Sequence, residues 1–147
     1  MKLSTRSRYS IKALLELSLQ ADGAPLSVRT IAKRQEIPAP YLEKLLISLR
    51  RAAIVESVRG AQGGYRLARE PDAILLGQIL AAVGETIELP EPAVDKPDRA
   101  EDWAIACLRR RLRRKLDEAL YTVSLAELYY DFRSWQAAQG DLGNFLI

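Results

Sequence analysis

The sequence predicts a mainly α-helical fold that contains one small β-hairpin. Apolar side chains recur at helical spacing through most of the 147 residues. Residues 54–67 differ, because they alternate in polarity and contain a cluster of glycines, which is the pattern of two strands joined by a turn. Hydrophobic residues make up 48% of the chain and charged residues 28%, so the chain has enough apolar side chains to bury one core.

The first helix is expected over residues 5–20, and either Thr5 or Ser7 can cap its start. Its apolar residues at helical spacing are Ile11, Leu14, Leu15 and Leu19. A short second helix is expected over residues 28–35, with Ser27 as its N-cap. The side chains expected to face inward from this second helix are Val28, Ile31 and Ala32.

The third helix is expected to begin near Pro40, whose missing N–H costs nothing in a first helical turn, and to end at about Ala52. Its buried stripe consists of Leu42, Leu45, Leu46 and Leu49. The side chains left on its outer face are Tyr41, Glu43, Lys44, Ser48, Arg50 and Arg51. The third helix is therefore amphipathic, with an outer face that is polar and mostly basic.

Residues 54–58 alternate as a strand, and residues 65–67 return as a second strand. The turn between them is rich in glycine and contains Gly60, Gly63 and Gly64. Three helices followed by a hairpin, in this order, predict a winged helix-turn-helix domain over residues 1–70.

A connecting helix is expected within residues 71–84, and an irregular linker is expected over residues 85–100, where prolines and acidic residues are frequent. Residues 101–147 are expected to form a long dimerisation helix and a C-terminal helix capped by Ser124. An apolar edge on the long helix is made by Ile105, Leu108, Leu112, Leu116 and Leu120.

Basic residues are concentrated in the first half of the chain. Residues 1–69 contain 13 Lys/Arg and 5 Asp/Glu, a net charge of +8, whereas residues 70–147 contain 9 and 14, a net charge of −5. Such a basic half indicates a module that binds a polyanion, although a solvated basic surface would explain the charge alone equally well. The helix and hairpin favour nucleic acid, because a helix fits the major groove of DNA and an arginine at a hairpin tip fits the minor groove.

Within this basic half, Glu43 can accept a hydrogen bond from a cytosine amino group, Arg59 can enter the minor groove, and Arg50 suits a phosphate. The expected DNA-binding residues are Arg8, Arg29, Pro40, Tyr41, Glu43, Lys44, Ser48, Arg50, Arg51, Arg59, Gly60, Gln62, Gly63, Gly64 and Tyr65. Further phosphate contacts are expected from Arg6, Lys33 and Arg34. The alternative is a winged-helix module that binds only other proteins.

The apolar edge of the long helix predicts a homodimer, because one winged helix cannot cover it and pairing with a second copy is the commonest solution. A symmetric dimer predicts a pseudo-palindromic operator in double-stranded DNA. The alternative is packing of this edge against its own domain. The basic run from Arg109 to Lys115 is expected to be a solvated face rather than a second DNA site.

Several motifs in the chain resemble one known family. They are Met1-Lys2-Leu3-Ser4, Arg8-Tyr9, Tyr41-Leu42-Glu43-Lys44-Leu45, Leu49-Arg50, Ser57-Val58-Arg59-Gly60 and Gly63-Gly64-Tyr65-Arg66-Leu67-Ala68. On these residues the chain resembles the Rrf-type winged-helix regulators, the group that includes IscR, NsrR and CymR. The resemblance implies a homodimeric bacterial transcription regulator whose third helix reads the major groove and whose wing reads the minor groove.

Many members of that family hold an iron–sulfur cluster through three cysteines, and this chain departs from that pattern. Trp103 stands where the last of those cysteines is expected, and Arg8 stands where some members have an acidic ligand. Cys107 is the one cysteine in the chain. One thiolate cannot supply the four-thiolate shell that such clusters need, so no cofactor and no metal are expected.

Cys107 is expected near the dimer edge as a buried small side chain. The alternative is a redox-sensing thiol, favoured by the neighbouring arginines. A regulatory partner protein or a small effector is a third means of control. The aromatic residues that could line a pocket for it are expected instead in the core, and they are Trp103, Tyr121, Tyr129, Tyr130 and Trp135.

The chain contains no His and one Cys. Hydrolase triads, common zinc sites and disulfide frameworks are thus excluded, and no enzymatic activity is expected. No window reaches the roughly 18 apolar residues that a membrane span needs, and the start of the chain lacks the apolar segment of a signal peptide. The expected location is the cytoplasm, where a free thiol stays reduced.

Overall fold

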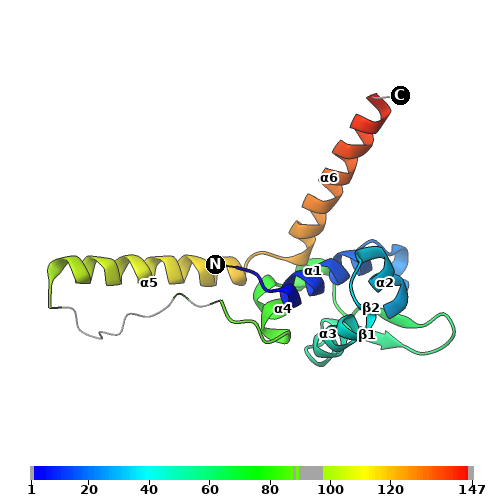
Figure 1. The fold of residues 1–147 in the computed structure, drawn as a ribbon, viewed down its shortest axis with the longest axis horizontal. Helices are drawn as coiled ribbons and strands as arrows, with labels where there is room; N and C mark the ends of the chain where they lie inside the picture. Colours follow the sequence, from blue (N-terminus) through cyan, green and yellow to red (C-terminus); the bar gives the residue numbers. More distant parts are fainter. Residues whose placement is uncertain (1, 88, 90–97, 146–147) are drawn as a thin grey trace.

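The computed structural model describes residues 2–87, 89 and 98–145, and their side chains as far as residue 141. The fold is mainly helical with one two-stranded antiparallel sheet, as the sequence predicts (Figure 1). The elements in chain order are α1 (Thr5–Ser18), η1 (Ala21–Gly23), α2 (Val28–Gln35), α3 (Ala39–Arg51), β1 (Val55–Val58), β2 (Gly64–Leu67), η2 (Pro71–Ala73), α4 (Leu76–Ala82), α5 (Ala100–Leu120) and α6 (Leu125–Phe145).

Serine side chains cap three of the helices. Ser27 accepts a hydrogen bond from the Thr30 backbone N at 3.1 Å, as expected for the start of α2. Ser124 and Glu127 form a reciprocal capping box at the start of α6, with N–O distances of 2.8 and 3.3 Å.

The cap of α1 differs from the prediction, because Ser4 rather than Thr5 or Ser7 provides it. Ser4 has an extended backbone, and its Oγ accepts a hydrogen bond from the Ser7 backbone N at 3.3 Å. Ser7 itself is fully buried on the inner face of α1. All three residues carry a capping hydroxyl, and only the folded backbone shows which of them precedes the first helical turn.

The inner face of α1 also includes small and polar residues that apolar spacing does not reveal. Leu14 is buried as expected, but Ile11 and Leu15 are only partly buried. The buried residues of α1 are Ser7, Ser10, Ala13, Leu14, Glu16 and Leu17. The buried face is thus rotated relative to the leucine pattern, because close packing against the other helices requires small side chains there.

The hairpin is anchored to the loop before α2. Leu26 and Tyr65 exchange two backbone hydrogen bonds, with N–O distances of 2.9 and 2.8 Å. Gly64 is predicted in the turn, but it belongs to β2 and lies opposite Val58. A Cβ on Gly64 would overlap the Leu26 carbonyl, so the close approach of these segments requires a glycine here.

The core joins the winged helix to the start of α6. The stripe predicted on α3 is buried, and Leu125 of α6 is fully buried with it. The chain returns to this core after α5, where the Leu76 N donates to the Val123 carbonyl at 2.9 Å. The Leu125 N also donates to the Ile74 carbonyl at 2.8 Å, so the loop before α6 is tied to the segment before α4.

Helices α5 and α6 extend away from the winged helix in different directions (Figure 1). α5 contains no buried residue, and Ile105, Leu108 and Leu112 on its apolar edge are each at least half exposed. α6 is the C-terminal helix expected after Ser124, and it continues without a break through Gly140. Residues 88 and 90–97 of the predicted linker lie outside the described residues.

None of the described helices combines the length and the apolar character that crossing a membrane requires.

Candidate nucleic-acid interface

The outer face of α3 is polar and exposed. Its first turn begins after Pro38, and four leucines on the opposite face are held in the core. Glu43 and Lys44 are exposed on the outer face, as are Arg50 and Arg51 in the last turn and Pro40 in the first. Ser48 is half-buried, and its Oγ donates to the Lys44 carbonyl at 3.2 Å, which leaves its oxygen as an acceptor.

Tyr41 is held against α1 by an aromatic contact. Its ring and that of Tyr9 lie 5.8 Å apart between centroids and cross at 75°, which is an edge-to-face arrangement. Both rings are half-buried and pack against the core. Tyr41 is therefore oriented by its neighbour, with one part of the ring inside and the remainder on the outer surface.

The loop between β1 and β2 contains Arg59, whose side chain is exposed to solvent. Arg59, Gly60 and Gln62 are all exposed, and the loop is closed by a hydrogen bond from the Gly63 N to the Gly60 carbonyl at 3.0 Å. Figure 1 shows this loop projecting from the fold beyond β1 and β2, on the side away from α5, and β1 contacts α3. The structure therefore brings the predicted helix and the predicted wing residues together at one end of the molecule.

Tyr65 does not share this exposed surface. Only 8% of it is exposed, and it belongs to the hydrophobic core beneath the hairpin. The sequence pattern places it at the interface because it follows the glycine turn directly. In β2, however, alternate side chains point to opposite faces, and Tyr65 is on the inner one.

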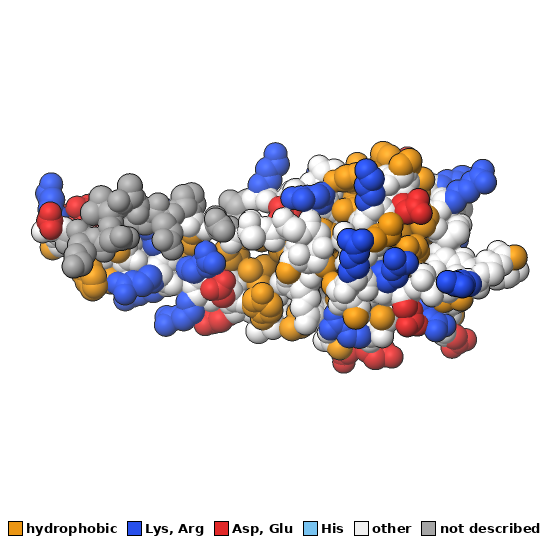
Figure 2. Space-filling view, turned by 90° about the horizontal axis from the view of Figure 1, so that it is seen from below, with side chains coloured by type: hydrophobic (Ala, Val, Ile, Leu, Met, Phe, Trp, Pro, Cys, Tyr) orange, Lys and Arg blue, Asp and Glu red, His pale blue; other side chains and the backbone are white. Residues whose placement is uncertain are grey.

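Basic residues of α1 and α2 flank α3. Arg8, Arg29 and Lys33 are exposed, and a shallow hollow on α2 is lined by Arg29, Thr30, Lys33 and Arg34. Figure 2 shows Lys and Arg side chains spread over the winged-helix end when the molecule is seen from below, with acidic side chains mostly along the lower edge of that view. A surface of this kind attracts phosphates and offers several donors to them.

Two acidic residues form hydrogen bonds with residues that are distant in sequence, and no local sequence pattern identifies either of them. Glu16 is buried, where it accepts a hydrogen bond from Gln35 Nε2 at 2.6 Å and pairs with Arg34 Nη1 at 3.4 Å. Glu85 accepts hydrogen bonds from the backbone N and the Oγ of Ser4. Neither contact has a local sequence signal, because the partners lie 18 to 19 and 81 residues away along the chain.

The aromatic residues outside the core are not placed as expected. Trp103, Tyr121, Tyr130 and Trp135 are each more than half exposed. Trp103 and Tyr121 lie near opposite ends of α5, a helix of 21 residues that spans about 30 Å, and Trp135 lies on a diverging helix. These residues therefore do not line one pocket within this chain.

Cys107 also lies away from the predicted dimer edge. It is half-buried, Arg110 Nη2 lies 3.5 Å from its sulfur, and Arg110 also covers the Trp103 ring. Residues 103, 107 and 110 share one face of α5, and helical spacing puts this face opposite Leu108 and Leu112.

An iron–sulfur cluster does not fit the residues present. Such clusters are held mainly by Cys thiolates, and the chain has one Cys and no His. Within the described ranges, no group of three His, Cys, Asp or Glu side chains is placed to hold a metal ion. Two copies of the chain would supply two thiolates, which is half of the usual shell.

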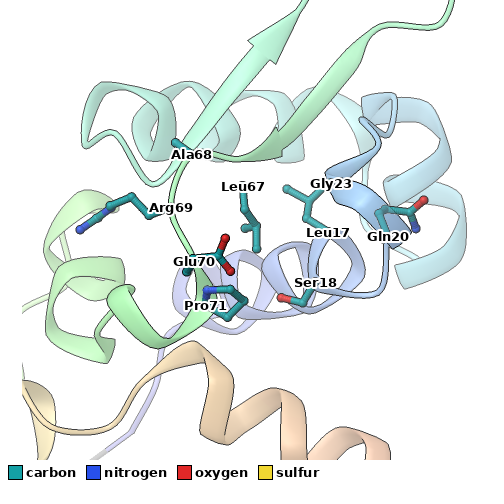
Figure 3. Close-up of a pocket in the computed structure, with 9 residues that line it drawn as sticks. All are labelled: Leu17, Ser18, Gln20, Gly23, Leu67, Ala68, Arg69, Glu70 and Pro71. Carbon is teal, nitrogen blue, oxygen red and sulfur yellow. The ribbon is translucent and has the colours of Figure 1, made fainter.

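A hollow on another part of the winged helix is an unsuitable candidate for a small ligand. It lies between the end of α1 and the segment after β2, and its lining residues are Leu17, Ser18, Gln20, Gly23, Leu67, Ala68, Arg69, Glu70 and Pro71 (Figure 3). Figure 3 shows the Arg69 side chain directed away from the other lining residues. Its guanidinium instead donates to the Ala53 and Ala73 carbonyls at 3.2 and 3.3 Å, which is a structural role.

Comparison with known proteins identifies a family of the same fold. The Rrf2 family, described as iron-dependent transcriptional regulators, matches residues 3–131. A Synechocystis sp. protein, whose name makes it a candidate HTH-type transcriptional regulator, is 57% identical over the full length of both chains. The structure of CymR from B. subtilis is 35% identical with a TM-score of 0.77, covering 88% of this chain and 97% of that one. T. potens IscR is 34% identical with a TM-score of 0.70, covering 92% and 91%. The chain therefore belongs to the Rrf2 family of winged-helix, DNA-binding transcription regulators.

Proposed function

We propose that the protein is a homodimeric transcription regulator that binds a specific operator, with α3 in the major groove and the β1–β2 loop in the minor groove. One observation carries this proposal. The exposed polar face of α3 is followed in the chain by the hairpin that carries the exposed Arg59 loop, β1 of this hairpin contacts α3, and the opposite face of α3 is fixed in the core. A rigid helix beside a flexible basic loop is the geometry that contacts adjacent grooves.

The exposed residues divide into two groups by what they can contact. Glu43 and Lys44 lie in the first half of α3, where side chains meet base edges; a carboxylate accepts from cytosine and an ammonium donates to guanine. Arg50, Arg51 and Arg29 suit phosphates, because they lie at the last turn of α3 and on α2. Tyr65 is left out of the proposed contact surface since it is buried.

The proposed dimer uses the apolar edge of α5. Ile105, Leu108 and Leu112 are half exposed or more, and no part of the described fold covers them. Pairing with the same edge of a second copy would bury these residues and relate two winged helices by a two-fold axis. In this proposal residues 1–70 bind DNA and residues 101–147 form the dimer. Segments 71–84 and 85–100 connect these two parts of the chain.

The test is direct binding of the full-length protein to DNA. Fluorescence anisotropy is measured with a duplex from the promoter of its own gene, and with a shuffled duplex of the same composition as the control. Specific binding is expected, and neutralisation of six to eight phosphates should weaken it roughly a thousandfold between 50 and 200 mM salt. A protein that binds no duplex at low ionic strength would refute the proposal and favour a module that binds only other proteins.

One observation favours a second function, which is redox sensing at Cys107. The sulfur is half-buried beside the Arg110 guanidinium, and reactive thiols occur in partly exposed, positively charged surroundings. If Cys107 senses oxidants, hydrogen peroxide should weaken operator binding by the wild type but leave the Cys107→Ser variant unaffected. Equal responses of the two proteins would assign Cys107 a packing role.

A further inference from the structure

The segment that leaves α4 turns back toward the start of α1. Gly84 adopts a left-handed backbone with φ +72°, which glycine reaches without strain. The Glu85 N donates to the Leu80 carbonyl at 2.9 Å, and the Gly84 N donates to the Ala81 carbonyl at 3.1 Å. These two bonds form a Schellman motif, so the backbone at Glu85 is fixed by the end of α4.

The Glu85 side chain then completes the cap of α1. Its Oε1 accepts from the Ser4 N at 3.0 Å, and its Oε2 accepts from the Ser4 Oγ at 2.7 Å. Arg6 Nη2 adds a contact with the Gly84 carbonyl at 3.5 Å. A carboxylate beside the first turn of a helix is favoured by the partial positive charge of that helix end. The start of α1 is thus held by a residue 81 positions away.

α1 in turn determines how the first turn of α3 is held. Pro38 at the N-cap of α3 makes no side-chain capping bond, so the start of α3 is oriented by packing. The edge-to-face contact between Tyr9 and Tyr41 joins the second turn of α1 to the first turn of α3. A displacement at the start of α1 would therefore reach Tyr41, which neighbours Lys44 three residues later on the surface of α3.

We propose that Glu85 is a positioning residue for DNA binding, which acts through Ser4, α1 and the Tyr9–Tyr41 contact on the first turn of α3. This inference rests on the proposed function, because its readout is operator affinity. Glu85 is also the residue at which the chain leaves the winged helix toward α5.

The first test uses the sign of the affinity change. Removal of a carboxylate makes the protein more positive, which by itself strengthens binding to DNA. Glu85→Ala should instead weaken operator binding by about fivefold or more, and Glu85→Gln, which keeps one acceptor oxygen, should fall between it and the wild type. The matched control is Glu70→Ala, because Glu70 is exposed and its carboxylate makes no hydrogen bond among the described residues. Glu70→Ala should bind as well as the wild type or slightly better.

The second test separates positioning from loss of stability. Affinities are measured at a temperature where circular dichroism shows every variant to be fully folded. Glu85→Ala is combined with Tyr9→Leu, which breaks the contact with Tyr41. If Glu85 acts through this contact, the Glu85→Ala loss should shrink to less than about twofold in the Tyr9→Leu background. Independent effects, with the same fold loss in both backgrounds, would overturn the proposed route.

The two proposals fail in different ways. If the wild type binds no duplex, the proposed function fails. If the wild type binds its operator and Glu85→Ala binds it equally well at the same salt concentration, the proposed function stands and the role of Glu85 is refuted. A loss in Glu85→Ala that Glu70→Ala shares would also refute it, because the effect would then not depend on the contact between Glu85 and Ser4.

Discussion

Arg59 is the residue whose position in the fold matches its proposed role most directly. It is exposed at the tip of a loop that glycines close, and no ion pair holds it among the described residues. A guanidinium free to enter a narrow minor groove gains both charge attraction and hydrogen bonds there.

Replacement of Arg59 by Ala should therefore weaken operator binding by about 1–3 kcal/mol and reduce the preference for operator over shuffled DNA. Anisotropy titrations with both duplexes at one salt concentration measure this change. Arg133→Ala is the control, because it removes the same charge from α6, which extends away from α3 (Figure 1). Equal losses on both duplexes would make Arg59 a phosphate contact without a role in sequence preference.

Glu16 is a second single residue with a specific role, which is to stabilise the fold rather than to contact DNA. The residue is 7% exposed, and its carboxylate accepts a hydrogen bond from Gln35 Nε2 at 2.6 Å, while Arg34, its ionic partner, is half exposed. Glu16→Ala leaves the Gln35 amide without its acceptor and should lower the free energy of unfolding by about 1–3 kcal/mol.

Chemical denaturation at one fixed protein concentration measures this loss. Glu16→Gln keeps an acceptor for Gln35 and loses only the ion pair with a solvated arginine, so its cost should stay below about 1 kcal/mol. If Glu16→Gln destabilises as much as Glu16→Ala, the charge rather than the hydrogen bond is the stabilising feature.

At the scale of the elements, local sequence signals fix some boundaries well. α2 spans Val28–Gln35, as predicted, because Ser27 caps its start and the residues before Pro38 leave helical geometry. The hairpin strands are predicted to within one residue, but Gly64 is assigned to the wrong element. Its role depends on Leu26, a residue distant in sequence, and no local pattern contains that contact.

Gly64→Ala should therefore destabilise the fold by about 1–3 kcal/mol or more, because its Cβ would overlap the Leu26 carbonyl at a positive φ of 150°. Gly60→Ala is the matched control, since Gly60 also has a positive φ, of 115°, but a Cβ there would meet no atom within 4 Å. Thermal unfolding of the two variants separates the overlap from the backbone strain. Similar losses would show that strain alone makes glycine necessary at position 64.

At the scale of the whole molecule, the exposed part of the apolar edge of α5 is the basis of the proposed homodimer. Ile105, Leu108 and Leu112 on this edge are each at least half exposed, whereas Leu116 and Leu120 are half-buried toward the end of α5, which contacts α4. The structure also places Cys107 on another face of the helix, so the thiol and the edge are separate features.

Leu112→Glu should shift the protein from dimer to monomer, because each dimer would lose two buried leucines, each worth about 1.5–3 kcal/mol, and would gain two facing charges. Sedimentation velocity over a range of concentrations should show the dimer dissociation constant rise by about a hundredfold or more. Arg111→Glu introduces the same side chain on another face of α5 and should leave the dimer intact. A wild type that sediments as a monomer at every concentration would contradict the proposed assembly.

Short-range patterns in the chain predict the order of the elements, the leucine stripe of α3 and the polar face opposite it, because helical spacing, caps and glycine turns act over a few residues. Other features become visible in the folded chain alone. They are the buried face of α1, the burial of Tyr65, the exposure of the aromatic residues on α5 and α6, and the contacts of Glu16 and Glu85 with distant partners. These features depend on which surfaces meet in the folded chain, and contacts across 18 or 81 residues leave no periodicity that a single sequence can reveal.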